Sequence, residues 1–238
     1  IERRRNEPFD YLTFAGSGEP TLSLDLGEVV SRAKQIVDSP VAVITNSTLL
    51  TSPAVRKEVA AADVVLPSLD AVSQEAFMAI NRPARGLFAE EMIQGLKDFR
   101  REYSGEIWLE VMLVEGINDH EAERIARAAE AIDPDRIQLN TVVRTPAEPV
   151  EPLSQEEMHR MREIFPRAEL IPDWDWSVPK SIKERMLKLL SERELTLQEI
   201  GLNLDLAGND AIKYCKILEK DGSISRKLYQ GNLYFHAN

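Results

Sequence analysis

Short apolar segments alternate with longer amphipathic segments through residues 11–140. The longer segments, such as 24–37 and 88–103, place apolar residues at helical spacing. Strands that alternate with helices are typical of a parallel α/β sheet. The sequence therefore predicts five parallel strands with helices between them, at 11–14, 41–45, 64–67, 107–114 and 137–140.

The composition changes after Val143, where prolines become frequent and one clear helix, 155–164, is predicted. Residues 180–238 then read as a separate domain of three helices and a β-hairpin that turns at Gln230-Gly231-Asn232. This order is typical of a winged helix-turn-helix. We therefore expect one domain over 1–170, a linker over 171–179 with two tryptophans, and a small α+β domain over 180–238.

Composition and charge narrow the functional classes. The chain is 43% hydrophobic and carries a net charge of -11, a field that repels nucleic acid unless basic residues gather on one face. A membrane protein is not expected, because the chain has no apolar run of the roughly 20 residues needed to span a bilayer. A single cysteine, Cys215, excludes an internal disulfide and fits the reducing cytoplasm.

A glycine-rich turn follows the first predicted strand. Gly16, Ser17, Gly18 and Glu19 precede Pro20, which fixes the exit of the turn. Glycines allow backbone conformations that turn polar groups toward a ligand, and the Glu19 carboxylate suits a cation such as an amine. An ordinary strand-to-helix loop is the alternative interpretation of the same residues.

Polar residues also follow the other predicted strands. Ligands of parallel α/β folds bind at the carboxyl ends of the strands, so these residues are candidates for a shared site. They are Thr45, Asn46 and Ser47, then Ser68 and Asp70, then Glu115, Asn118 and Asp119, and finally Asn140 and Thr141.

The Gly-Ser-Gly-Glu-Pro-Thr-Leu run, together with Asn81-Arg82-Pro83, resembles the radical S-adenosylmethionine (SAM) superfamily. Specifically, it is similar to the branch that contains the wyosine-type tRNA synthases. The resemblance covers about 11–146 and implies an incomplete (β/α)6 partial TIM barrel whose first strand is missing. An edge strand left uncovered in this way suggests dimerisation through the barrel edge.

The resemblance also implies roles for the polar residues. Gly16, Ser17, Gly18 and Glu19 would hold the methionine amine of SAM. Ser68 and Asp70 would contact its ribose or carboxylate, since a hydroxyl and a carboxylate suit ribose hydroxyls. The remaining cofactor-binding candidates are Thr45 and Asn46, Asn118, and, beside the adenine, Asn140.

The superfamily holds a [4Fe-4S] cluster with a Cys-x3-Cys-x2-Cys loop after its first strand. One thiol cannot anchor such a cluster, and Cys215 is expected in a helix core. The chain opens on Ile1, so we expect an N-terminally truncated fragment that is inactive alone. Its full-length parent would cleave SAM reductively to a 5'-deoxyadenosyl radical.

Three arginines, Arg82, Arg85 and Arg144, are candidates for binding a substrate carboxylate or phosphate; ion pairs with Glu90 or Glu91 are the alternative for the first two. The substrate class, whether small molecule, RNA or protein, stays open. A zinc site is not expected, because His120 and His159 lack ligand spacing. Two other functions also stay open: a ligand-sensing regulator with a DNA-binding C-terminal domain, and a non-catalytic scaffold.

Overall fold

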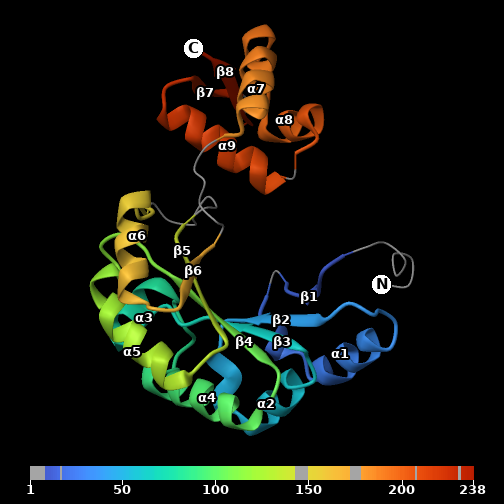
Figure 1. The fold of residues 1–238 in the computed structure, drawn as a ribbon, viewed down its shortest axis with the longest axis vertical. Helices are drawn as coiled ribbons and strands as arrows, with labels where there is room; N and C mark the ends of the chain where they lie inside the picture. The colour runs from blue at the N-terminus through green and yellow to red at the C-terminus, as the bar shows by residue number, and fades with distance from the viewer. Residues whose placement is uncertain (1–8, 17, 143–149, 172–177, 207, 230–231) are drawn as a thin grey trace. The chain divides into compact units, whose positions relative to one another are not determined.

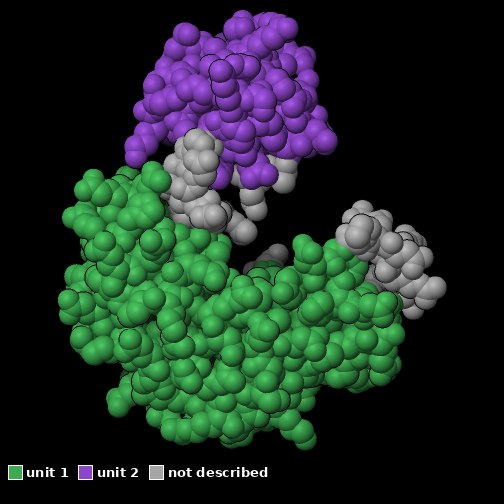
Figure 2. Space-filling view, viewed as in Figure 1, with its two compact units in different colours: residues 1–142, 149–173 green, residues 143–148, 174–238 purple. Residues whose placement is uncertain are grey.

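The computed structural model describes residues 9–16, 18–142, 150–171, 178–206, 208–229 and 232–238. The chain divides into two compact units, one of residues 1–142 and 149–173 and one of residues 143–148 and 174–238 (Figure 2). Most of the predicted linker 171–179, including Trp174 and Trp176, lies outside the described residues.

Unit 1 contains a parallel sheet of six described strands in sequential order, β1-β2-β3-β4-β5-β6 (Figure 1). The prediction of five strands was therefore one short, and the missed strand is β6, which pairs with β5 through Ile137 and Ala168. In β6 the charged Glu169 separates Ala168 from Leu170, so no apolar run marks this strand in the sequence. The strands are β1 Leu12–Phe14, β2 Val41–Thr45, β3 Val64–Pro67, β4 Glu106–Met112, β5 Arg136–Asn140 and β6 Ala168–Leu170.

Helices lie along one side of this sheet (Figure 1). In β4, Ile107, Leu109 and Val111 are fully buried, whereas the alternate residues Trp108 and Glu110 are only half-buried. One face of the strand is thus packed under helices and the other is partly open. The helices are α1 Leu26–Lys34, α2 Pro53–Val59, α3 Gln74–Ile80, α4 Ala89–Glu102, α5 Ala122–Ile132 and α6 Gln155–Ile164, with short 3-10 turns η2 Pro20–Leu22, η3 Thr48–Thr51 and η4 Asp119–Glu121.

Unit 2 contains three described helices and an antiparallel hairpin around its own core. Met186, Ile200 and Leu218 are buried there with Phe235 of the hairpin. Thr196 and Glu199 form a reciprocal capping box at the start of the second helix. The elements are α7 Lys180–Glu192, α8 Leu197–Leu204, α9 Gly208–Lys220, β7 Ile224–Tyr229 and β8 Asn232–Ala237.

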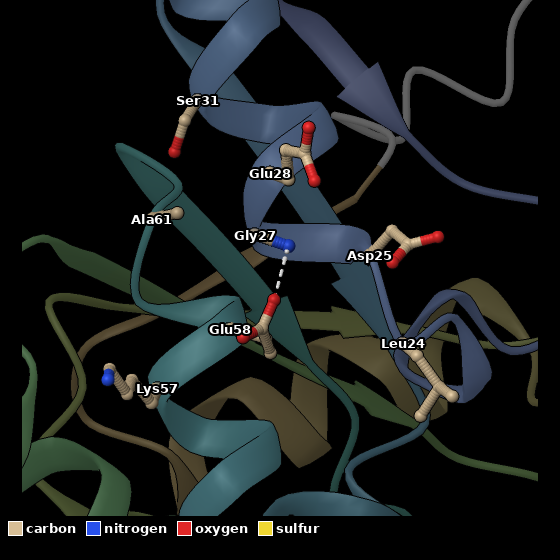
Figure 3. A pocket seen from close by; sticks show the side chains of 8 residues that line it. All are labelled: Leu24, Asp25, Gly27, Glu28, Ser31, Lys57, Glu58 and Ala61. Carbon is tan, nitrogen blue, oxygen red and sulfur yellow. Dashed lines mark hydrogen bonds between the residues drawn. The ribbon is translucent and has the colours of Figure 1, made fainter.

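Helix α1 is capped by a side chain from another helix. Asp25 occupies its N-cap position but makes no capping hydrogen bond with its side chain. Instead, Glu58 of α2 points at the start of α1, and its Oε2 accepts a hydrogen bond from Gly27 N at 2.9 Å (Figure 3). A carboxylate at this position satisfies a free amide and complements the helix dipole.

We expect Glu58→Ala to lower the free energy of unfolding by about 1 kcal/mol, the usual value of an N-terminal cap. Asp25→Ala is the matched control and should cost less, because the Asp25 side chain caps nothing. Urea unfolding followed by circular dichroism measures both. A larger loss for Asp25→Ala would contradict the cap assignment.

Candidate functional site

The Glu19 carboxylate ties the glycine-rich turn to the end of β2. Its Oε1 accepts hydrogen bonds from Thr45 Oγ1 at 2.6 Å and from Thr21 Oγ1 at 2.7 Å and Thr21 N at 3.1 Å. Its Oε2 accepts one from Asn46 N at 2.8 Å. Each carboxylate oxygen has two lone pairs, and Oε2 accepts one hydrogen bond, so Oε2 has room for a further donor.

Gly16, the first glycine of this turn, is not among the described glycines with a positive φ, which are Gly86, Gly116 and Gly222. A Cβ built on Gly18 would meet no described atom within 4 Å. The fold therefore does not require glycine at position 18, and the space beside it is open to a ligand. Ser17 lies outside the described residues.

The side chains after β2 mostly serve the local backbone. Asn46 Oδ1 accepts hydrogen bonds from Thr48 N and Thr48 Oγ1. Ser47, which has a left-handed backbone with φ 69°, donates its hydroxyl to Ser68 O at 2.7 Å. These bonds connect the ends of β2 and β3, and they place the half-buried Ser68 beside Asp70.

Asp70 is a buried carboxyl at the end of β3, with 6% of its surface exposed. Its Oδ1 accepts from Met112 N at 2.9 Å and its Oδ2 from Asn81 Nδ2 at 2.8 Å. Burial raises the pKa of Asp70 to about 6, and the nearby charge of Glu110 adds to the shift. A raised pKa in a buried carboxyl is typical of a functional site.

Asn118, predicted to bind the cofactor, is fully buried and bonded to backbone. Its Nδ2 donates to Asp70 O and Met112 O, and its Oδ1 accepts from Val114 N, each at 2.7 Å. These bonds use the capacity of the amide, so Asn118 holds the site in place.

Two carboxylates that the sequence analysis did not select also contribute. Glu121, 2% exposed, accepts from Val72 N and Ser73 N at 3.2 Å and so anchors the start of α3. Glu110, in the middle of β4, accepts a hydrogen bond from Asn140 Nδ2. The sequence gives one indication of Glu110: it is a charged residue that alternates with apolar residues within a predicted strand.

Two of the three arginine candidates lie within the described residues. Arg82 and Arg85 are exposed in the segment after α3, and Arg82 has a left-handed backbone with φ 47°. Asn81, next to Arg82, connects this segment to Asp70. Arg144 lies outside the described residues.

The described residues fit SAM and do not fit an iron–sulfur cluster. Asp70 and Glu19 keep free acceptor positions, and the buried Oδ1 atoms of Asn81 and Asn140 have no hydrogen-bond partner in the described chain. Such acceptors suit the amine and hydroxyl donors of SAM. By contrast, no group of three metal-binding side chains occurs among the described residues, and Cys215 is buried in unit 2 with a pKa that burial raises to about 12.

A surface pocket between α1 and α2, lined by Leu24, Asp25, Glu28 and Lys57 among others, contains none of the candidate residues (Figure 3). None of the described helices is both long and apolar enough to cross a membrane.

Comparison with known proteins gives a family match and several relatives. Residues 1–129 match the family model described as the radical SAM superfamily. The chain is 34% identical over 98% of its length to a protein named GTPase Obg of Brachyspira hyodysenteriae, of which it spans 36%. It is 28% identical over its full length to a UPF0026 protein of Methanocaldococcus jannaschii, of which it spans 77%.

Two solved structures share the fold at 20% identity. One is a domain of pyruvate-formate lyase-activating enzyme from Bacteroides vulgatus, with a TM-score of 0.54 over 67% of this chain and 97% of that one. The other is a radical SAM methyltransferase from Sphaerobacter thermophilus, with a TM-score of 0.51 over 71% of this chain and 52% of that one.

We expect Asp70→Asn to stabilise the protein at pH 8 and to change little at pH 4. The folded state favours the neutral form of the Asp70 carboxyl. The stability that this neutral form contributes is complete below about pH 4 and is lost as the pH rises through about 6. A shift of about two pKa units corresponds to about 3 kcal/mol as an upper value. Urea unfolding at both pH values measures the difference.

Asp135→Asn is the control with the opposite sign. Partial burial opposes ionisation of Asp135, but hydrogen bonds from Ile107 N and Arg100 lower its pKa. That substitution should destabilise the protein at pH 8, and its effect should fade as the pH falls. Equal effects of Asp70→Asn at pH 4 and pH 8 would contradict the raised pKa.

Proposed function

The chain belongs to the radical SAM superfamily, and we propose that it forms the SAM-binding part of a longer radical SAM enzyme. One observation carries the proposal. Asp70, a buried carboxyl whose charge is unfavourable for the fold, is held with free acceptor positions at the carboxyl ends of the strands. The glycine-rich turn and Asn140 lie at the same ends of β1 and β5.

Each residue has a defined task in this proposal. Glu19 Oε2 accepts a hydrogen bond from the methionine amine, while its other oxygen keeps the turn attached to β2. Asp70, beside Ser68, accepts from the ribose hydroxyls. Gly18 leaves room for the ligand next to the backbone. In this proposal the residues orient SAM, and a [4Fe-4S] cluster held by residues outside this chain would supply the electron for its cleavage.

The cluster ligands are proposed to come from residues outside this chain, because the sequence contains one cysteine. β1 is a suitable place for that segment to pack. Among the described strands β1 pairs with β2 alone, and Leu22 and Leu24 nearby are 68% and 92% exposed. If the 238-residue chain dimerises through this edge, a longer chain that covers the edge should be monomeric in light scattering.

Within the superfamily we propose the wyosine-synthase-like branch, on the Gly-Ser-Gly-Glu-Pro-Thr-Leu and Asn-Arg-Pro runs. Arg82 and Arg85 are proposed to contact an anionic group of the substrate, because Asn81 connects their segment to Asp70. A sequence pI near 4.9 favours a small molecule or protein over RNA as the substrate.

Unit 2 is proposed to be a winged-helix-like domain that contacts protein or substrate. Cations on the helices and hairpin pair with carboxylates: Arg226 with Glu219 at 2.9 Å and Lys227 with Glu194 at 2.6 Å. Paired cations give little counterion release on duplex DNA. The rival function, a DNA-binding regulator, would require salt-dependent duplex binding by the chain.

We expect the chain to bind S-adenosylhomocysteine, which carries the amine and adenosine of SAM, in isothermal titration calorimetry. Gly18→Ala should weaken binding at least about tenfold, the effect of losing about 1.4 kcal/mol, with unchanged unfolding. Gly222 lies in unit 2 and has a φ of 74°. Gly222→Ala should lower the free energy of unfolding by straining the backbone, and it should leave the affinity unchanged. Unchanged affinity of Gly18→Ala would contradict the proposed site.

A separate test concerns the cluster. The longer protein, reconstituted with iron and sulfide, should show charge-transfer absorption and cleave SAM under a strong reductant. The 238-residue chain treated in the same way should retain no iron. Stoichiometric cluster binding by the shorter chain would refute the proposal that the ligands lie outside it.

A further inference from the structure

Glu110 occupies a central position on the half-open face of the sheet. Its backbone pairs with Ser68 on one side and with Gln138 on the other. The residues that share its face on β4, Trp108 and Met112, are half-buried like Glu110 itself. Glu110 is therefore a carboxylate placed in the middle of the sheet, between the strands that carry Asp70 and Asn140.

The side chain of Glu110 determines how the Asn140 amide is turned. Asn140 Nδ2 donates to Glu110 Oε1. An ionised carboxylate accepts hydrogen bonds and cannot donate one, so it selects the orientation in which the amide nitrogen faces Glu110. The carbonyl end of Asn140 then faces elsewhere, and its Oδ1 is buried without a hydrogen-bond partner among the described residues.

An unpartnered buried acceptor is unfavourable and uncommon in native proteins. A ligand that brings a donor to Asn140 Oδ1 removes this cost. This acceptor lies close to the Asp70 carboxyl along the sheet, because Met112, whose amide donates to Asp70 Oδ1, pairs with Asn140. An adenosyl ligand carries two separate sets of donors, the ribose hydroxyls and the exocyclic amine, which could serve these two acceptors.

We propose that Glu110 is a positioning residue that fixes the Asn140 amide so that its carbonyl oxygen accepts a hydrogen bond from the exocyclic amine of an adenosyl ligand. The proposal rests on the SAM site proposed above. It explains why a carboxylate stands in the sheet at a place where an apolar side chain would pack more favourably. It also gives the site a preference for adenine over a base with a carbonyl group at the same position.

The test compares S-adenosylhomocysteine with S-inosylhomocysteine, in which an acceptor replaces the amine, by calorimetry on the full chain. The wild-type chain should prefer the adenosyl ligand at least about tenfold, as expected for one lost hydrogen bond to a buried group. Glu110→Gln should reduce the preference to within about threefold, because glutamine can either donate or accept and so permits both amide orientations.

Glu106→Gln is the matched control. It makes the same chemical change on the same face of β4, at a carboxylate that instead accepts from Trp108 Nε1 at 2.8 Å. It should keep the full preference for the adenosyl ligand. Equal binding of both ligands by the wild-type chain, or an unchanged preference in Glu110→Gln, would overturn the proposal.

A measurement without ligand separates local positioning from binding. In nitrogen–proton correlation spectra, one Asn140 side-chain proton should be shifted downfield by its bond to Glu110 and should move upfield in Glu110→Gln but not in Glu106→Gln. An unchanged Asn140 signal in Glu110→Gln would overturn the positioning role. Failure of both ligands to bind wild type would overturn the SAM site as well, whereas Gly18-dependent binding without discrimination would overturn the role of Glu110 alone.

Discussion

The buried amide of Asn118 is the interaction on which the candidate site depends. Three backbone groups of two neighbouring strand ends converge on one side chain, namely the carbonyls of Asp70 and Met112 and the amide of Val114. Removing this side chain would leave all three without their partner in a buried region, at about 1–3 kcal/mol for each group. The amide thus fixes the backbone from which the Asp70 carboxyl is presented, and Asp70 in turn holds Asn81.

The site is built from polar groups that are unfavourable for the fold. Burial raises the pKa of Asp70 to about 6, so the carboxylate present at neutral pH destabilises the folded state. Glu110 adds a second negative charge close by. Such local conflicts between sequence and stability are expected at functional sites. Asn118 and Glu121 are different, because their hydrogen bonds to backbone groups stabilise the strand ends and the start of α3 around Asp70.

The sequence predicts the strands and helices of this chain well wherever an element is long enough to show a period. The strand Val41–Thr45 and the helix Gln155–Ile164 have the predicted bounds. The strand Ala168–Leu170 was missed because Glu169 interrupts its apolar residues, and the helix Gln74–Ile80 was missed because it spans only about two turns. Alternation also could not reveal that Glu110 meets Asn140, since the contact joins residues on separate strands.

The turn between β1 and β2 shows how one carboxylate can serve the fold and a ligand together. Gly16 has no positive φ, so a left-handed backbone at that residue does not shape the turn. The turn is instead held by Glu19, whose Oε1 takes three hydrogen bonds from Thr21 and Thr45. Oε2 takes one, from Asn46 N. A cationic donor can therefore join Oε2 without displacing any bond, and a site that needs no rearrangement loses little affinity to ordering. The open space beside Gly18 is where the ligand would lie.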